Sequence, residues 1–225
     1  MADKRQETTA SSAGEFRKYT TIAGLLPIIR DREITLLDPL RWEDRNDAEA
    51  MGVYKTRNGR KTLLASCFAQ GPETYGHWKA FSSTPEGAAI SFDRNIFLES
   101  IKELNEIPES NELRMEKVEY KSIDKLPAQI DVREIPFLKR YPYRGEEEFR
   151  IIYESNGDEG KYKNLCFACG SIREIRLSPW LHEKLVEPLK EVIQKSVPKD
   201  ENIRIFRSTL LENNKWLEKI RAICN

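Results

Sequence analysis

The stretch KRYPYRGEEEFRIIY, residues 139–153, decides how this 225-residue chain is interpreted. Cationic and aromatic residues lead into three consecutive glutamates, and residues 149–153 then form an apolar run that predicts a strand. Since strand side chains alternate with period two, we expect Glu146 and Glu148 on one face and Glu147 on the other. Two carboxylates this close raise the pKa of one of them, as acid/base chemistry requires. The alternative is a solvated charge run at an edge strand.

Charged and aromatic side chains next to the glutamates suggest a reaction site. Glu148 and Glu146, at the mouth of the strand, are the expected catalytic residues. We add Arg150, which alternation places on the same face and which we expect to hold the strand mouth rigid in a buried ion pair with a glutamate. The preceding cluster of cations and rings is suited to guiding a base to this site. The expected substrate-binding residues are Lys139, Arg140, Tyr143 and Arg144.

Composition limits the class of protein. Lysine plus arginine number 37, and aspartate plus glutamate also number 37, so no overall positive charge points to nucleic acid. Local basic clusters can still bind phosphate, so nucleic acid is not excluded. Four cysteines without a leading apolar segment favour reduced thiols and a cytoplasmic location. No run approaches the roughly 18 apolar residues that a membrane span requires.

The chain is expected to form one domain. Residues 1–14 are polar and rich in small residues, which predicts a disordered tail, and residues 15–225 are expected to form a single catalytic domain. Alternating apolar runs and short helical segments predict an α+β fold with about eight strands. SNGDEG, between RIIYE and NLCFAC, predicts a hairpin turn. Asp47 is the predicted N-cap of a short helix.

Metal chemistry is the main alternative from the residues themselves. Cys166 and Cys169 form a single CxxC, but no second pair lies at metal-ligand spacing, so no metal is expected. Asp44, Asp47 and Glu49 could nevertheless coordinate magnesium together with Glu148, which would favour a metal-dependent nuclease. A noncatalytic binding module and a structural partner protein also stay open.

Several segments together resemble a widespread bacterial family of unknown function. Its members share a Cys-Phe strand, a helix bearing a tryptophan, a Gly-x-x-Ile-x-Phe strand and an ExExR motif, and the resemblance covers about residues 16–217. In this sequence the marks are Cys67 and Phe68, Trp78, Gly87 with Ile90 and Phe92, and Glu146, Glu148 and Arg150. This resemblance assigns no chemistry.

A second resemblance, to ADP-ribosyltransferases, implies a chemistry. Those enzymes place a polar residue on a first strand, another on a second strand, and a glutamate, often within ExE, at the opening of a late strand. The chain matches the ExE well and lacks a clean His-Thr or Ser-Thr-Ser triplet. The resemblance implies a split mixed β-sheet with flanking helices, and NAD as substrate without a metal. The residues it implies for NAD binding are Arg17, Tyr19, Thr20, Ser66 and Trp78.

The function expected from the sequence is therefore an NAD-dependent ADP-ribosyltransferase that modifies a macromolecule. The cluster at 139–144 favours nucleic acid as the acceptor, RNA more than DNA. Small enzymes of this resemblance usually serve as bacterial toxins or anti-phage effectors, so an antitoxin protein is an expected partner. We expect NAD to lie between residues 17–21 and the ExE strand, with the helix of Trp78 as one wall.

Overall fold

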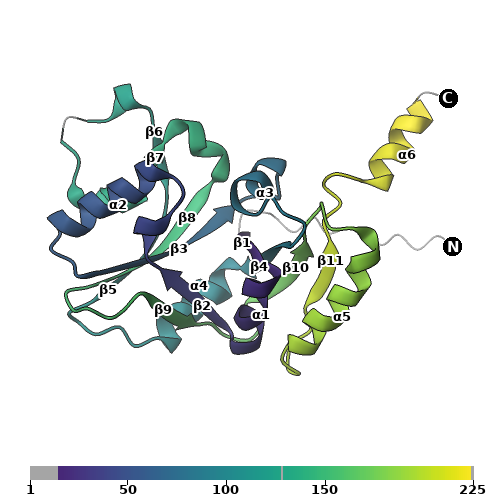
Figure 1. The fold of residues 1–225 in the computed structure, drawn as a ribbon, viewed down its shortest axis with the longest axis horizontal. Helices are drawn as coiled ribbons and strands as arrows, with labels where there is room; N and C mark the ends of the chain where they lie inside the picture. Colours follow the sequence, from purple (N-terminus) through teal and green to yellow (C-terminus); the bar gives the residue numbers. More distant parts are fainter. Residues whose placement is uncertain (1–14, 128, 224–225) are drawn as a thin grey trace.

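A single large β-sheet organises the part of the chain that the computed structural model describes, residues 15–127 and 129–223 (Figure 1). In spatial order the sheet contains β11 (Arg204–Arg207), β10 (Ile172–Leu177), β4 (Gly87–Asp93), β1 (Glu15–Thr21), β3 (Thr62–Gln70), β2 (Glu33–Leu37) and β9 (Tyr162–Cys166). Strand β8 (Glu148–Ser155) also pairs with β3, and β5 (Glu112–Lys117) pairs with β8. A separate parallel pair joins β6 (Glu119–Lys121) to β7 (Leu138–Arg140).

Helices cover the sheet and fill its connections. The α-helices are α1 (Ile22–Asp31), α2 (Arg45–Arg57), α3 (Tyr75–Phe81), α4 (Arg94–Leu104), α5 (Val186–Ser196) and α6 (Asn214–Ile223). Short 3-10 turns are η2 (Pro39–Arg41), η3 (Ile123–Lys125), η4 (Val132–Phe137), η5 (Tyr141–Glu146) and η6 (Glu183–Leu185). In the main sheet the pairs are antiparallel except β10 with β11, which is parallel. The expected α+β fold, a mixed sheet with flanking helices, is confirmed.

The sheet is split beside the middle of β3. Strand β1 pairs with β3 only at Phe16–Gln70 and Arg17–Ala69, and β2 pairs with it at Leu37–Ala65. Between these contacts, among the described residues, the edge of β3 at Ser66 and Cys67 has no strand beside it. The opposite edge of β3 is paired along its length with β8, from Thr62–Ser155 to Ala69–Glu148. The split therefore lies one strand away from the predicted catalytic glutamates.

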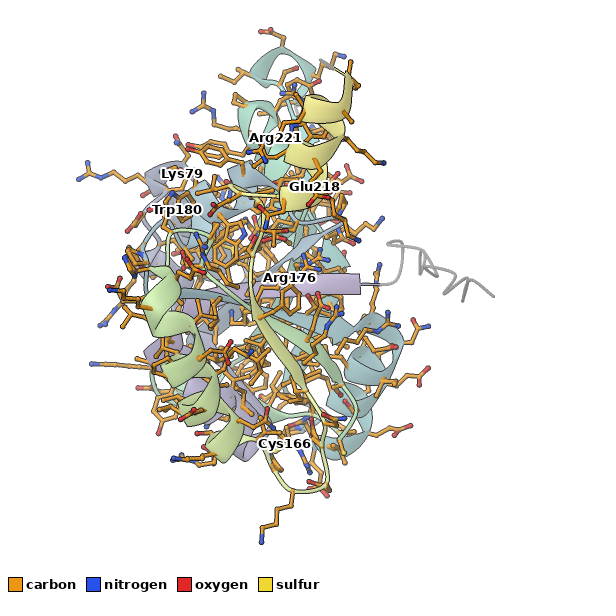
Figure 2. All side chains as sticks on the ribbon, turned by 90° about the vertical axis from the view of Figure 1, so that its right-hand side faces the viewer. Lys79, Cys166, Arg176, Trp180, Glu218 and Arg221 are labelled. Carbon is orange, nitrogen blue, oxygen red and sulfur yellow. The ribbon has the colours of Figure 1, made fainter. Side chains whose placement is uncertain are left out.

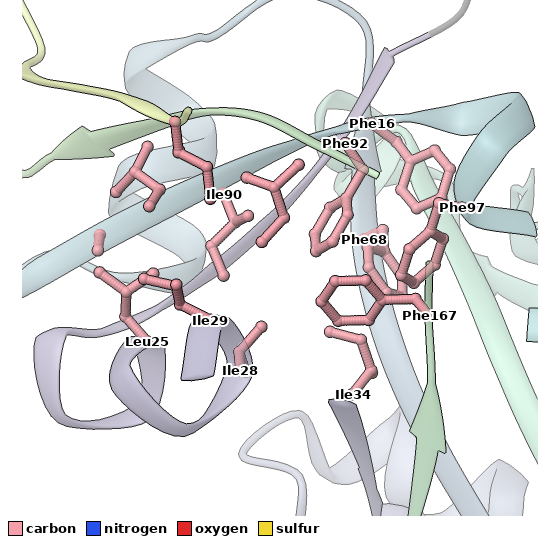
Figure 3. Close-up of a cluster of buried hydrophobic side chains, with 14 of the residues drawn as sticks. Phe16, Leu25, Ile28, Ile29, Ile34, Phe68, Ile90, Phe92, Phe97 and Phe167 are labelled. Carbon is pink, nitrogen blue, oxygen red and sulfur yellow. The ribbon is translucent and has the colours of Figure 1, made fainter. Parts of the chain in front are cut away.

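One face of the sheet carries the larger apolar core. Aromatic rings from β1, β3, β4 and α4 meet there with ring centroids 4.4–6.2 Å apart: Phe16, Phe68, Phe92 and Phe97 (Figure 3). Helix α1 adds Leu25, Ile28 and Ile29. Each such side chain contributes about 1.5–3 kcal/mol when fully buried. This core fixes β1 and β3 against each other at the point where they begin to diverge.

The other face of the sheet carries a smaller apolar cluster and the charged residues of β8. Helix α2 and η4 cover this face, and the cluster comprises Met51, Tyr54, Leu63, Ala65, Phe137 and Ile152. Along β8, Phe149 and Ile151 point to the larger core, while Glu148 and Arg150 point to the α2 side. Period-two alternation is thus confirmed within the strand itself.

The predicted hairpin is wrong. Strands β8 and β9 do follow one another around SNGDEG, but β9 pairs with β2 over five residues, from Glu33–Cys166 to Leu37–Tyr162. Turn residues predict where the chain reverses, whereas the partner of the next strand depends on which sheet edge is open. Both edges of β8 are already taken by β3 and β5. The predicted disordered tail, residues 1–14, lies outside the described residues.

Candidate active site

Arg150 is the centre of a buried network of charges. Its side chain is fully buried, and its guanidinium donates to both oxygens of Glu148 at 2.9 and 3.0 Å and to both oxygens of Asp47 at 3.0 and 2.5 Å. A further bond of 2.8 Å reaches the carbonyl of Pro136, and the ring of Trp42 lies 4.8 Å from the guanidinium carbon. All five N–H donors are therefore used. The predicted buried pair between Arg150 and a glutamate is present.

Asp47 joins this network instead of capping its helix. The N-cap of α2 is Asp44, whose carboxylate accepts a 2.9 Å bond from the backbone N–H of Asn46. Asp47 lies one turn further on and is 5% exposed, with its side chain directed to Arg150. The predicted cap was wrong by three residues, because positions 44 and 47 both carry an aspartate near the start of the same helix. Only the tertiary partner distinguishes the two.

Lys139 links three carboxylates. Its Nζ lies 2.5 Å from Glu146, 3.2 Å from Glu148 and 3.5 Å from Asp47. Its side chain is 9% exposed, and its ammonium packs over the ring of Tyr143 at 5.1 Å. The structure therefore directs this predicted substrate-binding lysine inward, where it brings Glu146 and Glu148 together.

The network separates the two carboxyl groups in pKa. Burial alone would raise the pKa of Glu148, but the charge and hydrogen bonds of Arg150, with the charge of Lys139, lower it to about 2. Burial raises the pKa of Glu146 above its ordinary value despite the hydrogen bond from Lys139. The charges of Glu148 and Glu146 raise the pKa of Lys139 against the effect of burial. Two neighbouring carboxyls with opposite shifts are typical of acid/base sites.

The three glutamates form a turn into the strand, which is left-handed at Glu147; residues 146–148 are called the glutamate turn below. Strand β8 begins at Glu148, η5 ends at Glu146, and Glu147 between them has φ 45° and ψ 49°. Strand alternation is therefore the wrong reason for the proximity of Glu146 and Glu148, which meet through this turn and through Lys139. The backbone is anchored on both sides, because Gln70 N–H donates to Glu147 O at 2.8 Å and Glu148 N–H donates to the hydroxyl of Tyr120 at 2.8 Å.

Lys18 occupies the split between β1 and β3. Its Nζ donates to Ser66 Oγ at 2.8 Å and to the carbonyl of Cys67 at 3.5 Å, and it lies 5.3 Å from the centre of the Phe68 ring. Burial lowers the pKa of Lys18, although a Cys67 thiolate and the charge of Glu148 would favour its protonated form. The ammonium takes the place of a ladder bond at the unpaired edge of β3. Ser66, predicted to bind NAD, is thus bonded to Lys18.

Of the remaining predicted NAD-binding residues, Arg17, Tyr19 and Trp78 lie on the α3 side of β1, whereas the Thr20 side chain lies against Gly24 of α1. Arg17 is buried and donates to the carbonyl of Gly71, while the Thr20 carbonyl accepts a 3.1 Å bond from Ser82 Oγ. Tyr19 packs against Trp78 with ring centroids 5.1 Å apart. Trp78 is fully buried, and its Nε1 donates to Glu73 at 2.5 Å. Trp78 therefore positions Tyr19 and presents no surface of its own.

The outer wall of this region is aromatic and cationic. Trp180 lies against Trp78 with centroids 6.4 Å apart, and Lys79 Nζ lies 4.6 Å from the centre of the Trp180 ring (Figure 2). Below them, Arg176 donates to Glu73 at 2.8 Å. These contacts fix α3 on the sheet.

Sequence reasoning did not identify His77 as a site residue, because a single histidine among bulky residues gives no local signal. It is 1% exposed, and neither ring nitrogen has a hydrogen-bond partner among residues 15–127 and 129–223. Burial lowers the pKa of His77, against the charge of Glu147 and the nearby carbonyl of Gly145. The ring centroid of Tyr19 lies 6.0 Å from that of His77, and the Tyr19 hydroxyl is also buried without a partner among the described residues. Only the fold brings these two groups together.

Three residues within or just before η5 remain at the surface. Arg140, Tyr141 and Arg144 are exposed, and the guanidinium of Arg144 stacks on the ring of Tyr141 at 4.5 Å. Of the predicted substrate-binding residues, Arg140 and Arg144 are thus available to a ligand, and Tyr143 is half-buried under Lys139.

The possible metal ligands are engaged elsewhere. Within residues 15–127 and 129–223 no group of three or more His, Cys, Asp or Glu is arranged to hold a metal ion. Cys166 Sγ lies 3.8 Å from Glu33, whereas Cys169 is exposed and contacts the carbonyl of Asp200.

No helix among residues 15–127 and 129–223 is long and apolar enough to span a membrane.

Comparisons with known proteins complete the description. No family model matches the chain and no curated protein matches it, so the resemblance to the bacterial family of unknown function stays a prediction. Among solved structures, the chain is similar to Thermus sp. 2.9 DarT in complex with NAD+, at 11% identity and a TM-score of 0.42, over 87% of this chain and 96% of that chain. The same protein in complex with ADP-ribosylated ssDNA matches at 11% identity and 0.42, over 87% and 94%.

Proposed function

We propose that this protein is an NAD-dependent ADP-ribosyltransferase that modifies a nucleic acid. The observation that carries the proposal is the position of the glutamate turn beside the split in the sheet. Arg17 of β1 pairs with Ala69 of β3, which pairs with Glu148 of β8. Neighbouring strands lie about 4.8 Å apart, so the first strand is about 10 Å from the glutamates. A ligand between β1 and the glutamate turn would contact both.

The charges at the turn suit transfer of ADP-ribose. In that reaction the bond between ribose C1′ and the nicotinamide nitrogen breaks, and its electron pair stays on nicotinamide, which leaves neutral. A lone pair of the acceptor forms the new bond to C1′, and the acceptor loses a proton. Ionised carboxylates stabilise the positive charge that develops on the ribose. Glu148 is ionised at neutral pH, and the raised pKa of Glu146 suits it to receive the proton. Arg150 would contribute by holding Glu148.

NAD would be held from β1. We assign Arg17 to the pyrophosphate, because guanidinium groups bind phosphate in a bidentate manner. Tyr19 would offer its buried hydroxyl, with Trp78 fixing the orientation of its ring. Thr20 lies on β1, and Ser66 lies at the split edge of β3. The unsatisfied Tyr19 hydroxyl supports this fit, since buried polar groups normally find a partner.

Nucleic acid is the proposed acceptor. Arg140, Tyr141 and Arg144 form an exposed surface of cations and an aromatic ring on the turn that ends in the glutamates. Such surfaces bind single strands by contacting phosphates and stacking on bases. RNA is the acceptor expected from the sequence, and DNA is the alternative. A toxin or anti-phage role with an antitoxin partner belongs to this proposal.

The test uses NAD labelled in its adenylate phosphate. The parent protein is incubated with the label and separately with single-stranded RNA, single-stranded DNA or cell-extract protein, with and without chelator. We expect labelled nucleic acid that is unaffected by chelator, loss of label with Glu148→Gln, and full labelling with Glu103→Gln, a change at an exposed residue of α4. No nicotinamide release with any acceptor would overturn the proposal. Chelator-sensitive cleavage of the nucleic acid would instead support a metal-dependent nuclease.

A further inference from the structure

Glu148 is poorly placed to touch a substrate. Its side chain is 2% exposed, and its two oxygens accept from Arg150, with Lys139 at 3.2 Å from one of them. A ribose hydroxyl would have to enter this buried network to reach the carboxylate. Ion pairs with full hydrogen bonding in a buried site are costly to break.

Glu147 differs from Glu148 in each of these respects. It is exposed, and its carboxylate forms no hydrogen bond or ion pair with residues 15–127 and 129–223. Its backbone lies in the left-handed region, which is unfavourable for a residue with a side chain, and strained residues of this kind cluster at functional sites. The surrounding structure maintains the strain through the bond from Gln70 N–H to Glu147 O.

The Glu147 carboxylate lies on the β1 side of the glutamate turn. A methyl group added to Gly71 would lie 2.4 Å from Glu147 Oε2, so the carboxylate packs directly on this glycine at the end of β3. The carbonyl of the same glycine accepts from Arg17. Glu147 and Arg17 therefore meet at the same glycine, at the end of β3 that is paired with β1.

Two unsatisfied polar groups lie in the same region. His77 is close enough for the Glu147 charge to act on its ring, and α3, which carries it, packs against η5. Both ring nitrogens and the hydroxyl of Tyr19 are buried without a hydrogen bond of standard geometry among the described residues, and the backbone of Gly145 lies near the His77 ring. A neutral imidazole has one donor and one acceptor, and a hydroxyl has both. A carboxamide, with an N–H donor and a carbonyl acceptor, matches this pair.

We propose that Glu147 is the carboxylate that meets the ribose of the substrate, and that His77 with Tyr19 receives the nicotinamide carboxamide. This assignment rests on the proposed function. Glu147 accepts a hydrogen bond from a ribose hydroxyl and stays ionised while the C1′–nitrogen bond breaks and the acceptor bonds to C1′. No bond forms to Glu147. Glu148 is then a positioning residue, which holds the turn through Arg150 and Lys139.

The first test compares glutamine variants at the three glutamates by nicotinamide release. We expect Glu147→Gln to lower kcat at least about 100-fold with an unchanged melting temperature. Glu147→Gly removes the carboxylate and suits the left-handed backbone, so it should melt no lower than the parent and be equally inactive. Glu103→Gln is the matched control. This pair of variants separates loss of the carboxylate from loss of the fold.

The second test observes the ligand contact directly. The chain has two histidines, His77 and His182, so nuclear magnetic resonance of the imidazoles gives one reporter and one internal control. A non-hydrolysable NAD analogue should shift the ring signals of His77 and leave those of His182 unchanged. His77→Gln should weaken binding about 10-fold, which corresponds to the loss of about one hydrogen bond.

The outcomes distinguish this inference from the proposed function. A parent that releases nicotinamide while Glu147→Gln is equally active would overturn the role of Glu147 alone. If a saturating concentration of the NAD analogue leaves the ring signals of His77 unshifted, the proposed carboxamide site is overturned. A parent that neither binds nor cleaves NAD would overturn the proposed function and, with it, both assignments.

Discussion

The two faces of β8 are equally buried and chemically opposite. Phe149 and Ile151 enter an apolar core, where burial is itself stabilising. Glu148 and Arg150 enter the α2 side, where burial is unfavourable unless every charge is paired. A hydrophobic replacement of such a network is often neutral or stabilising. We therefore interpret the apolar face as the source of stability and the charged face as the part of the strand that holds a reaction site in a fixed geometry.

The largest expected effect comes from removing the cation at the centre of the charged face. Arg150→Ala leaves Asp47 buried without the two hydrogen bonds from Arg150 and leaves Glu148 buried with the bond from Lys139. Breaking buried pairs in this way costs about 3–5 kcal/mol. Denaturant unfolding monitored by circular dichroism measures it. Ile151→Val, on the apolar face, should cost only about 1 kcal/mol. Equal effects of the two changes would contradict the contrast between the faces.

The next effect is on activity. Glu148→Gln removes the charge and retains the shape, so it should lower the rate of ADP-ribose transfer by about 100-fold, with the labelled-NAD assay as the measurement. An unaltered rate would show that the charge on this face has no part in the reaction.

Binding to the first strand is the third prediction. Arg17→Ala combined with Tyr19→Ala should abolish binding of a non-hydrolysable NAD analogue in calorimetric titration, because it removes the proposed pyrophosphate and ring contacts together. Deleting residues 1–13 should leave binding intact. Unchanged affinity in the double variant would place the ligand away from β1.

The pH dependence of stability should include a contribution from the charged face. The pKa of Glu148 is lowered from 4.5 to about 2 in the folded state, so its contribution is fully present above pH 4.5 and is lost as pH falls toward 2. This contribution is about 3 kcal/mol. Glu148→Gln should therefore flatten the unfolding free energy between pH 4.5 and 2. A parent curve with no more slope than that of the variant would contradict the ionised state of Glu148.

The smallest expected effect is at the split. Lys18 is half-buried in the folded state and burial of its ammonium lowers its pKa, so its protonated form is disfavoured there and weakens folding at pH values below that pKa. Lys18→Met keeps the length of the side chain and should stabilise the protein at neutral pH by no more than about 1 kcal/mol in thermal unfolding. A large loss of stability would show that its bond to Ser66 holds the two strands together.

The sequence by itself determined most elements and the cluster of charges at the start of β8. Apolar periodicity predicted a single α+β domain and the strand after the glutamates, because side-chain spacing follows directly from the geometry of helices and strands. The same local reasoning placed Glu146, Glu148 and Arg150 in one cluster. It also predicted that Arg150 would form a buried or half-buried pair with a glutamate, since alternation places it on the same face as Glu148.

Tertiary structure decided everything that depends on a partner distant in the sequence. The predicted hairpin is absent because β9 pairs with the edge of β2. Asp47 is not the helix cap, because its carboxylate accepts hydrogen bonds from Arg150, which lies 103 residues away in the sequence. The left-handed turn at Glu147 and the unsatisfied His77 have no local signature. Periodicity encodes which face of an element is buried, but only packing decides which charges meet on that face and which polar groups are left for a ligand.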